Sequence, residues 1–209
     1  MNAAWKWGGV AKTLFILMVG ATAAGPAMSN VETPTYAIVE TSGDIEIRRY
    51  DPMVIAEVEV TGPRDVASGT GFRLLADYIF GNNEITPGVA VVEQQGSVKI
   101  AMTAPVQQQA AGDTWRISFV MPSEYRLDTL PRPVNNRVTL KAVPAQTVVA
   151  ITFSGRNTDS NVHSHESELR RFVERRGLAV TGSPKYAFYN PPWTLPMLRR
   201  NEIMLALVP

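Results

Sequence analysis

The feature that most constrains the fold is the order in which two hydrophobic periods alternate along the chain. Residues 36–41, 44–50 and 53–61 alternate apolar with polar side chains, and this period of two predicts β-strands. Ser42-Gly43 separates the first two segments, which predicts a hairpin, and Gly62-Pro63 ends the third. We therefore expect the chain to begin with antiparallel strands.

Two other segments follow the period of an α-helix. Residues 64–80 and 162–176 place apolar side chains three and four positions apart, and Gly81 and Gly177 follow where each helix should end. Packing into a core is the plain interpretation of such stripes. The stripes comprise Phe72, Leu75, Ala76 and Ile79 in the first helix and Leu169, Phe172 and Val173 in the second.

The remaining periodic segments predict six more strands. They lie at residues 99–109, 114–121, 137–143, 146–154, 186–189 and 202–208. Pro105 interrupts the first of these, which indicates an edge or a bulge. The order strand–strand–helix–strand thus occurs twice. We expect one α+β domain over residues 31–209, an antiparallel sheet carrying two helices, with two similar halves.

The first 30 residues have the pattern of a secretory signal peptide. Lys6 and Lys12 precede a run of apolar and small residues at 13–24, and no acidic residue occurs before Glu32. This run is shorter than the roughly 20 residues that a spanning helix needs. Cleavage sites that fit the pattern follow Ala23, Ala27 and Ser29. We expect export to the periplasm or the medium and no membrane span after cleavage, with an uncleaved anchor as the alternative.

Composition excludes several classes of protein. The chain has no cysteine, which excludes disulfides, iron–sulfur clusters and Cys-ligated zinc. The formal net charge of +1 falls to −1 once the two lysines of the expected signal peptide are removed. Such a balance provides no basic surface for nucleic acid or anionic lipid. A chain of 209 residues with 45% hydrophobic content is long enough for one globular core.

Four short motifs follow one another along the chain, and none of them is a catalytic signature. They are Lys99-Ile-Ala-Met-Thr-Ala-Pro-Val106, Phe119-Val-Met-Pro-Ser-Glu-Tyr125, Tyr189-Asn-Pro-Pro-Trp193 and Arg199-Arg-Asn-Glu-Ile203. Each motif alone is weak, but the ordered set is specific. From about Tyr36 to Leu207 the chain resembles the SOUL/heme-binding protein family.

This resemblance implies a fold and a ligand. The fold is a distorted antiparallel barrel flanked by two helices. The ligand is heme or a related tetrapyrrole, held without catalysis in a groove beside the first helix and bordered by the loop before the last strand. Apolar side chains would meet the macrocycle, and Arg73 or Arg199 would lie near its carboxylates. The expected ligand-binding residues are Phe72, Arg73, Leu75, Ile79, Trp193, Met197 and Arg199.

The chain departs from the family at positions that bear on heme. One branch is proposed to ligate heme iron through a His where this chain has Arg49, between Arg48 and Tyr50. An Arg has no lone pair to donate at ordinary pH. Asp77 and Thr194 replace two basic residues that another branch places near the propionates. We therefore expect heme or free-base porphyrin to bind without axial His ligation, and we predict no metal site.

Other candidate residues have plainer interpretations. His163 and His165 lie two positions apart at a helix start, where their side chains point to different faces and cannot share a metal. Met102 and Met121 lie in expected strands, where core filling is far commoner than iron ligation.

Two further functions stay open at this point. One is an enzyme that uses an acid and a base in the same groove, drawn from Glu84, Glu93, Glu124 and Tyr125, although nothing pairs them in sequence. The other is an interaction protein that docks a partner through the loop around Trp193. A concave groove large enough for a macrocycle would favour ligand binding, whereas a flat apolar patch would favour docking.

Overall fold

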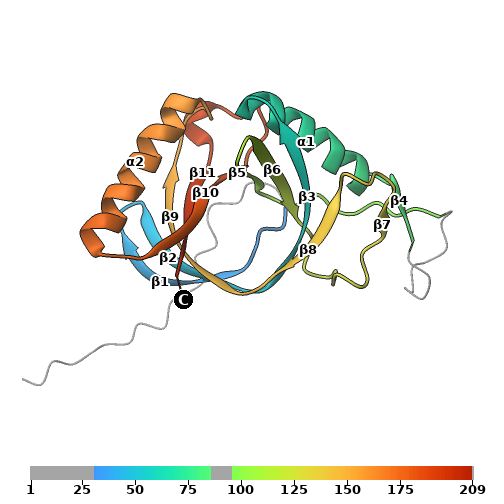
Figure 1. The fold of residues 1–209 in the computed structure, drawn as a ribbon, viewed down its shortest axis with the longest axis horizontal. Helices are drawn as coiled ribbons and strands as arrows, with labels where there is room; N and C mark the ends of the chain where they lie inside the picture. The colour runs from blue at the N-terminus through green and yellow to red at the C-terminus, as the bar shows by residue number, and fades with distance from the viewer. Residues whose placement is uncertain (1–30, 86–95, 209) are drawn as a thin grey trace, which may run out of the picture.

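The computed structural model describes residues 31–85 and 96–208, so the expected signal peptide lies outside the described residues. One strongly curved antiparallel sheet carries two long helices on its convex side, α1 (Arg64–Ile79) and α2 (Asp159–Arg176) (Figure 1). This arrangement confirms the expected α+β class and both expected helices.

The described strands form one large sheet and one small one. Their bounds are β1 (Tyr36–Ser42), β2 (Ile45–Tyr50), β3 (Met53–Thr61), β4 (Asn83–Glu84), β5 (Val106–Ala111), β6 (Thr114–Val120), β7 (Arg132–Pro133), β8 (Thr139–Val143), β9 (Gln146–Phe153), β10 (Val180–Phe188) and β11 (Asn201–Leu207). The nine-stranded sheet has the order β1-β2-β9-β11-β10-β5-β6-β3-β8, and its neighbours are antiparallel. Strands β4 and β7 pair separately.

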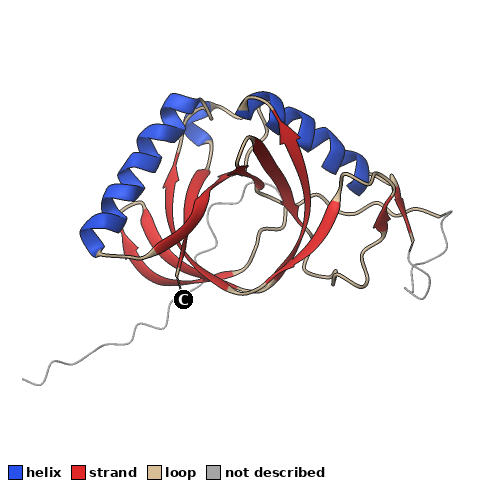
Figure 2. Cartoon of the chain, viewed as in Figure 1, coloured by secondary structure: helices blue, strands red, loops and turns tan. Residues whose placement is uncertain are grey.

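The two helices divide the core into two parts. Helix α1 packs on β3 and β6, and α2 packs on β9 and β11 (Figure 2). The pairing of β10 with β5 joins the two parts into one sheet. The β1–β2 hairpin precedes α1 in the chain but pairs with β9, under α2. The two parts of the sheet therefore do not coincide with the two halves of the sequence.

Helix α1 lies close to the sheet because two small residues face β6 and β3. Ala67 is fully buried, and Gly71 lies so near Ile117 that an added Cβ would meet Ile117 Cγ1 at 2.5 Å. Leu75 and Ile79 continue the same stripe and are 0% and 1% exposed. Gly71 thus sets the distance between helix and sheet, although it lowers the intrinsic helix propensity.

We predict opposite effects for alanine at the two glycines of α1. Gly71→Ala should lower the free energy of unfolding by about 1–3 kcal/mol, because the new methyl overpacks against Ile117. Gly69→Ala should raise it by about 0.5–1 kcal/mol, because Gly69 is exposed and only Arg73 comes within 4 Å of its added Cβ. Urea unfolding of both variants checks this, and equal effects would contradict the close approach.

Helix α2 begins three residues earlier than the sequence pattern predicts. Thr158 lies in extended conformation before it, and its Oγ1 accepts a hydrogen bond from the Asn161 N–H at 3.4 Å. This N-cap satisfies a backbone donor that the apolar period does not reveal. Gly177 ends the helix in the left-handed conformation, with φ of 61°, as its sequence position predicts.

The segment from Lys99 to Pro105 is not a strand, so the expectation of a strand over residues 99–109 is wrong in its first part. Strand β5 begins at Val106. Ile100 N–H donates to the Ile79 carbonyl at 2.8 Å, and Ala104 N–H donates to the backbone carbonyl of Glu32 at 2.9 Å. These hydrogen bonds join the segment to α1 and to the N-terminal segment, so these N–H groups are not available for pairing with a neighbouring strand. Pro105 has no N–H to donate to such a pairing.

The other strand boundaries differ less. Strand β8 begins at Thr139, two residues later than expected, and β10 spans Val180–Phe188, well before the expected start at residue 186. The pairing of β10 with β11 is irregular between Thr181 and Lys185, which hides the alternation in the sequence. The short pair of β4 and β7 was not expected, because two-residue strands carry no period.

Candidate functional site

The loop between β10 and β11 exposes large apolar side chains. We call residues 189–200 the Trp193 loop; it contains the 3₁₀ turn η1 (Pro196–Leu198). Its large exposed apolar side chains are Trp193 at 82%, Met197 at 71%, Leu195 at 58% and Leu198 at 58%. Several large apolar groups held in water by one loop indicate a contact surface.

Arg199 holds this loop in shape. Its Nε donates to the Thr194 carbonyl at 2.8 Å, and its Nη2 donates to the Pro192 carbonyl. The guanidinium therefore satisfies two carbonyl groups of the loop. Arg199 thus uses two of its five N–H donors inside the loop, and its expected contact with a ligand carboxylate stays a prediction.

The Trp193 loop meets the starts of both helices at one corner of the molecule (Figure 1). Gly155 N–H donates to the Pro196 carbonyl at 2.9 Å, and Asn201 Nδ2 donates to the Gly155 carbonyl at 3.1 Å. Arg64, the first residue of α1, donates to the Asn157 carbonyl at 2.5 Å. Three segments far apart in sequence thus share this corner.

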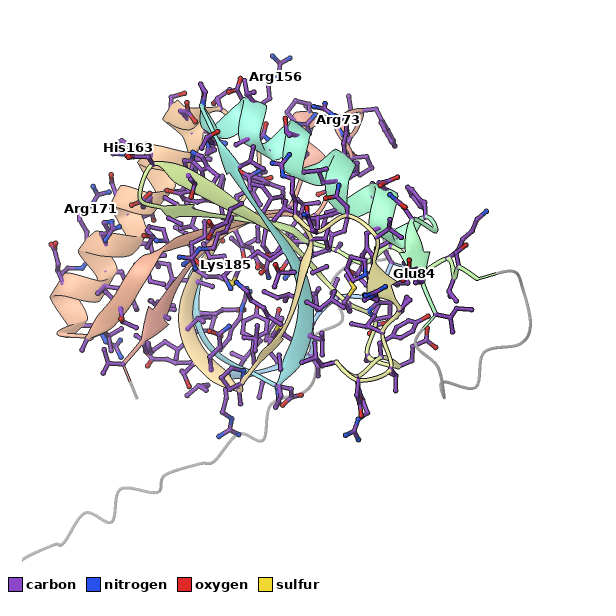
Figure 3. All side chains as sticks on the ribbon, turned by 45° about the vertical axis from the view of Figure 1, so that its right-hand side comes forward. Arg73, Glu84, Arg156, His163, Arg171 and Lys185 are labelled. Atoms are coloured by element: carbon purple, nitrogen blue, oxygen red, sulfur yellow. The ribbon has the colours of Figure 1, made fainter. Side chains whose placement is uncertain are left out.

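The residues expected on α1 fall on two sides of the helix. Leu75 and Ile79 are buried, because their stripe is the one that packs on the sheet, and they support the surface from beneath. Phe72 is 37% exposed and meets Phe119 edge-on, with ring centroids 5.5 Å apart. Arg73 lies on the outer side of α1, where its Nη2 donates to Thr70 Oγ1 at 3.2 Å (Figure 3). Phe72 and Arg73 offer surface to a ligand; the site itself stays a prediction.

The match to known proteins covers nearly the whole described chain. The family model for the SOUL heme-binding protein matches residues 31–206. The chain belongs to the SOUL heme-binding protein family. Heme-binding protein 1 of Mus musculus is 25% identical over 182 residues, which cover 84% of this chain and 93% of the mouse protein.

Solved structures share the fold at low identity. The C-terminal domain of EcmrR has a TM-score of 0.55 at 13% identity, with 78% of this chain and 96% of that domain covered. A hydrolase from Listeria innocua has a TM-score of 0.54 at 14% identity, with 81% and 94% covered. At such identities these similarities establish the architecture of this SOUL-family chain and nothing about its chemistry.

A buried ion network lies beside the Trp193 loop, on the concave side of the sheet. Glu202 is 0% exposed and accepts from Arg200 Nη2 at 2.6 Å and from the Tyr189 hydroxyl at 2.7 Å. Arg48 Nη1 lies 3.0 Å from the same carboxylate. Burial alone would raise the pKa of Glu202, but the charges of Arg48 and Arg200 outweigh it and hold the pKa below its ordinary value. Arg200 is thus a structural cation in this family member.

Neither histidine belongs to the Trp193 loop or to α1; both lie in the first turns of α2. His165 stacks on Phe153 with ring centroids 4.2 Å apart, and its Nδ1 lies 2.8 Å from the Asn161 carbonyl. His163 is exposed on α2, on the opposite flank from Arg73 (Figure 3). Within the described ranges no group of three or more His, Asp or Glu side chains is placed to hold a metal. The same residues contain no helix long and apolar enough to span a membrane.

The side chains weighed for acid–base chemistry do not converge. Glu84 forms an exposed ion pair with Arg132 on the β4–β7 pair, and Glu124 is exposed. Burial, and then the neighbouring Glu124, raises the pKa of Tyr125. Glu93 lies outside the described residues. Among the three described candidates, Glu84, Glu124 and Tyr125, no carboxylate is hydrogen-bonded to the tyrosine as an acid–base pair would be.

Two cavities lie elsewhere in the fold, and neither is lined by any of the seven expected residues. The larger, of about 910 Å³, opens where the N-terminal segment 32–35 crosses the ends of β3, β6 and β8. The smaller, of about 130 Å³, lies on the concave side of the sheet and includes Lys185 in its wall. Sequence patterns give no signal for such cavities, because their walls come from many strands.

Proposed function

We propose that this chain binds a tetrapyrrole, heme or free-base porphyrin, on the surface formed by the Trp193 loop and the outer side of α1. The observation that carries the proposal is the group of exposed apolar side chains in that loop, held at the corner where α1 begins. Membership of the SOUL heme-binding family and the name of the mouse relative support a tetrapyrrole as the ligand.

Different residues would contact the apolar macrocycle and its carboxylates. Trp193 and Met197 would cover the macrocycle, and Phe72 would meet it from the helix. Area removed from water stabilises such a contact by roughly 25 cal/mol per Å² before the costs of association. Arg73 donates a single hydrogen bond within the described residues, to Thr70, so most of its guanidinium remains for a propionate.

We predict that hemin and metal-free protoporphyrin IX bind with affinities within about tenfold of each other, a gap of about 1.4 kcal/mol. The reason is that neither histidine belongs to the Trp193 loop or to α1, so we expect iron to add little. Absorbance titrations of the mature protein with both ligands check this.

The histidine variants are the matched controls for that titration. His163→Ala and His165→Ala should bind both ligands as the parent protein does. If hemin alone binds, and either substitution abolishes its Soret shift, iron ligation governs binding and the site assignment must be abandoned.

A protein-docking role for the Trp193 loop is the second candidate function. Its support is that Trp193 is 82% exposed and that neither cavity lies under the loop. Absence of binding by both hemin and protoporphyrin IX would favour it over the tetrapyrrole.

The place of action is part of the proposal. The lysine-bearing, apolar start of the chain supports export. A mature N-terminus between residues 24 and 30, found by sequencing the native protein, is the test; an intact Met1 in the cytoplasm would refute it.

A further inference from the structure

A row of paired side chains crosses the concave face of the sheet, away from both helices. Lys185 on β10 pairs with Met204 on one side and with Gln109 on the other. Gln109 pairs with Arg116, which in turn pairs with Glu59. Directly paired residues of antiparallel strands project to the same face. Two cations therefore share this face, with Glu59 at the far end of the row.

The carboxylates of this face do not satisfy both cations. Glu57 is paired with Lys141, whose Nζ lies 2.5 Å from its Oε1. Glu59 lies 3.5 Å from Arg116 Nε, but that buried N–H donates no hydrogen bond. Among the described residues, Lys185 forms no ion pair. An ammonium without an ion-pair partner among the described residues and an unsatisfied guanidinium N–H thus lie in one row, and both favour an anion.

The cavity beside Lys185 has the size and lining for a small amphipathic molecule. Its volume of about 130 Å³ is well below that of a site for a drug-sized ligand. Gln107 accepts from Ser118 Oγ at 3.4 Å, and its amide N–H groups donate to no other described residue. The apolar part of the wall consists of Met53, Val148, Met204 and Ala206. Figure 3 shows Lys185 inside the curve of the sheet.

The electrostatics of Lys185 agree with this geometry. Burial lowers the pKa of its ammonium, the Arg116 charge lowers it further, and Glu57 offsets part of the effect. A bound anion would restore the charged form by supplying the missing counter-ion. An exposed lysine needs no such counter-ion, because water solvates its ammonium group.

We propose that this cavity binds a short-chain monocarboxylate. The carboxylate would accept from Lys185 Nζ and from the amide of Gln107, and the short apolar tail would lie against Met53 and Met204. A macrocycle does not fit a cavity of 130 Å³, so this site is separate from the proposed tetrapyrrole surface.

Methionine methyl groups provide a readout that needs no mutation. In protein labelled with ¹³C at the methionine methyls, sodium butyrate should shift the resonance of Met204, which lines the small cavity. The resonances of Met121, which lines the larger cavity, and of Met197, in the Trp193 loop, should not shift. Shifts confined to Met121 or Met197, or no shift at all, would overturn the proposal. Porphyrin binding at the Trp193 loop would shift the resonance of Met197 alone. The carboxylate site and the tetrapyrrole surface can therefore be refuted independently of each other.

A matched pair of lysine variants tests the charge. Lys185→Met should weaken butyrate binding at least tenfold in calorimetric titration at constant ionic strength, whereas Lys99→Met, at an exposed lysine, should leave it unchanged. Butylamine and butanol, which share the tail but lack the carboxylate, should not bind. Equal butyrate affinity in Lys185→Met and the parent, or tighter binding of butylamine than of butyrate, would overturn the proposal.

Discussion

Replacing Glu202 with Gln is expected to lower the free energy of unfolding by about 1.5–3 kcal/mol, because charge-assisted hydrogen bonds are lost while Arg48 keeps its ion pair with Glu46. The side chain keeps its shape, but the amide cannot neutralise Arg48 and Arg200, whose guanidinium nitrogens lie 3.0 and 2.6 Å from the present carboxylate. Arg48 is 2% exposed and cannot regain water without unfolding. Chemical denaturation of parent and variant at pH 7 measures the loss.

The pH dependence provides a second test of the same ion network. The pKa of Glu202 is lowered in the folded protein, so its charge contributes stability above about pH 4.3, the ordinary value for Glu. That contribution is lost as the pH falls through the folded pKa, so parent and variant should converge in acid. Asp128→Asn, in the exposed pair with Arg126, should change stability little at any pH. A constant difference from pH 7 to acid would contradict the role of the Glu202 charge.

Replacing Trp193 with Ala is expected to weaken hemin and protoporphyrin IX alike. If one face of the indole covers the macrocycle over about 100 Å², its loss costs about 2.5 kcal/mol, or roughly 70-fold in affinity. Trp193 is 82% exposed, so the substitution should leave stability unchanged. Absorbance titration of the variant with both ligands measures the change.

Leu127→Ala is the matched control for Trp193→Ala. Leu127 is also a large apolar side chain on the surface, 45% exposed, but it lines the larger cavity. Its truncation should leave tetrapyrrole affinity unchanged. The opposite pattern, with Leu127→Ala weakening binding and Trp193→Ala neutral, would move the ligand to the 910 Å³ cavity.

The helices could be predicted because their information is local. The stripe through Leu75 and Ile79 repeats at the helical period over several turns, and both residues are buried as such a stripe requires. The helical period alone does not show which residues of the α1 stripe remain in contact with water. That depends on how closely the helix approaches the sheet, which Gly71 and Ile117 decide together.

The strands were predictable where alternation is regular and unpredictable where pairing overrides it. Val54 to Val60 alternate and form β3, whereas Lys99 to Ala104 have strand-like residues but bond to α1 and the N-terminal segment. Thr181 to Lys185 were not predicted as strand, because an irregularity in the β10–β11 ladder breaks their period. A ladder needs a partner, and sequence alone does not identify partners far along the chain.

The candidate site divides in the same way. The Pro-rich loop, with Trp193 and Met197 as its apolar side chains, was visible as a motif, and both residues are exposed. The role of Arg199 was not visible, because its bonds to Pro192 and Thr194 depend on the path of the loop backbone. The ion network of Glu202 was not predicted either, because one of its cations, Arg48, comes from a distant strand.

By itself, the sequence determined the class of fold, the two helices and the membership of the SOUL heme-binding family. Those properties follow from periods and ordered motifs that act over a few neighbouring residues. Only the tertiary structure decided that the β1–β2 hairpin pairs under α2, and that Glu202 is neutralised by Arg48 from a distant strand. Only the fold left Lys185 on the concave face without an ion-pair partner among the described residues. The physical reason is that charge compensation and burial depend on which distant segments meet, and long-range pairing across a curved sheet leaves no local pattern in the chain.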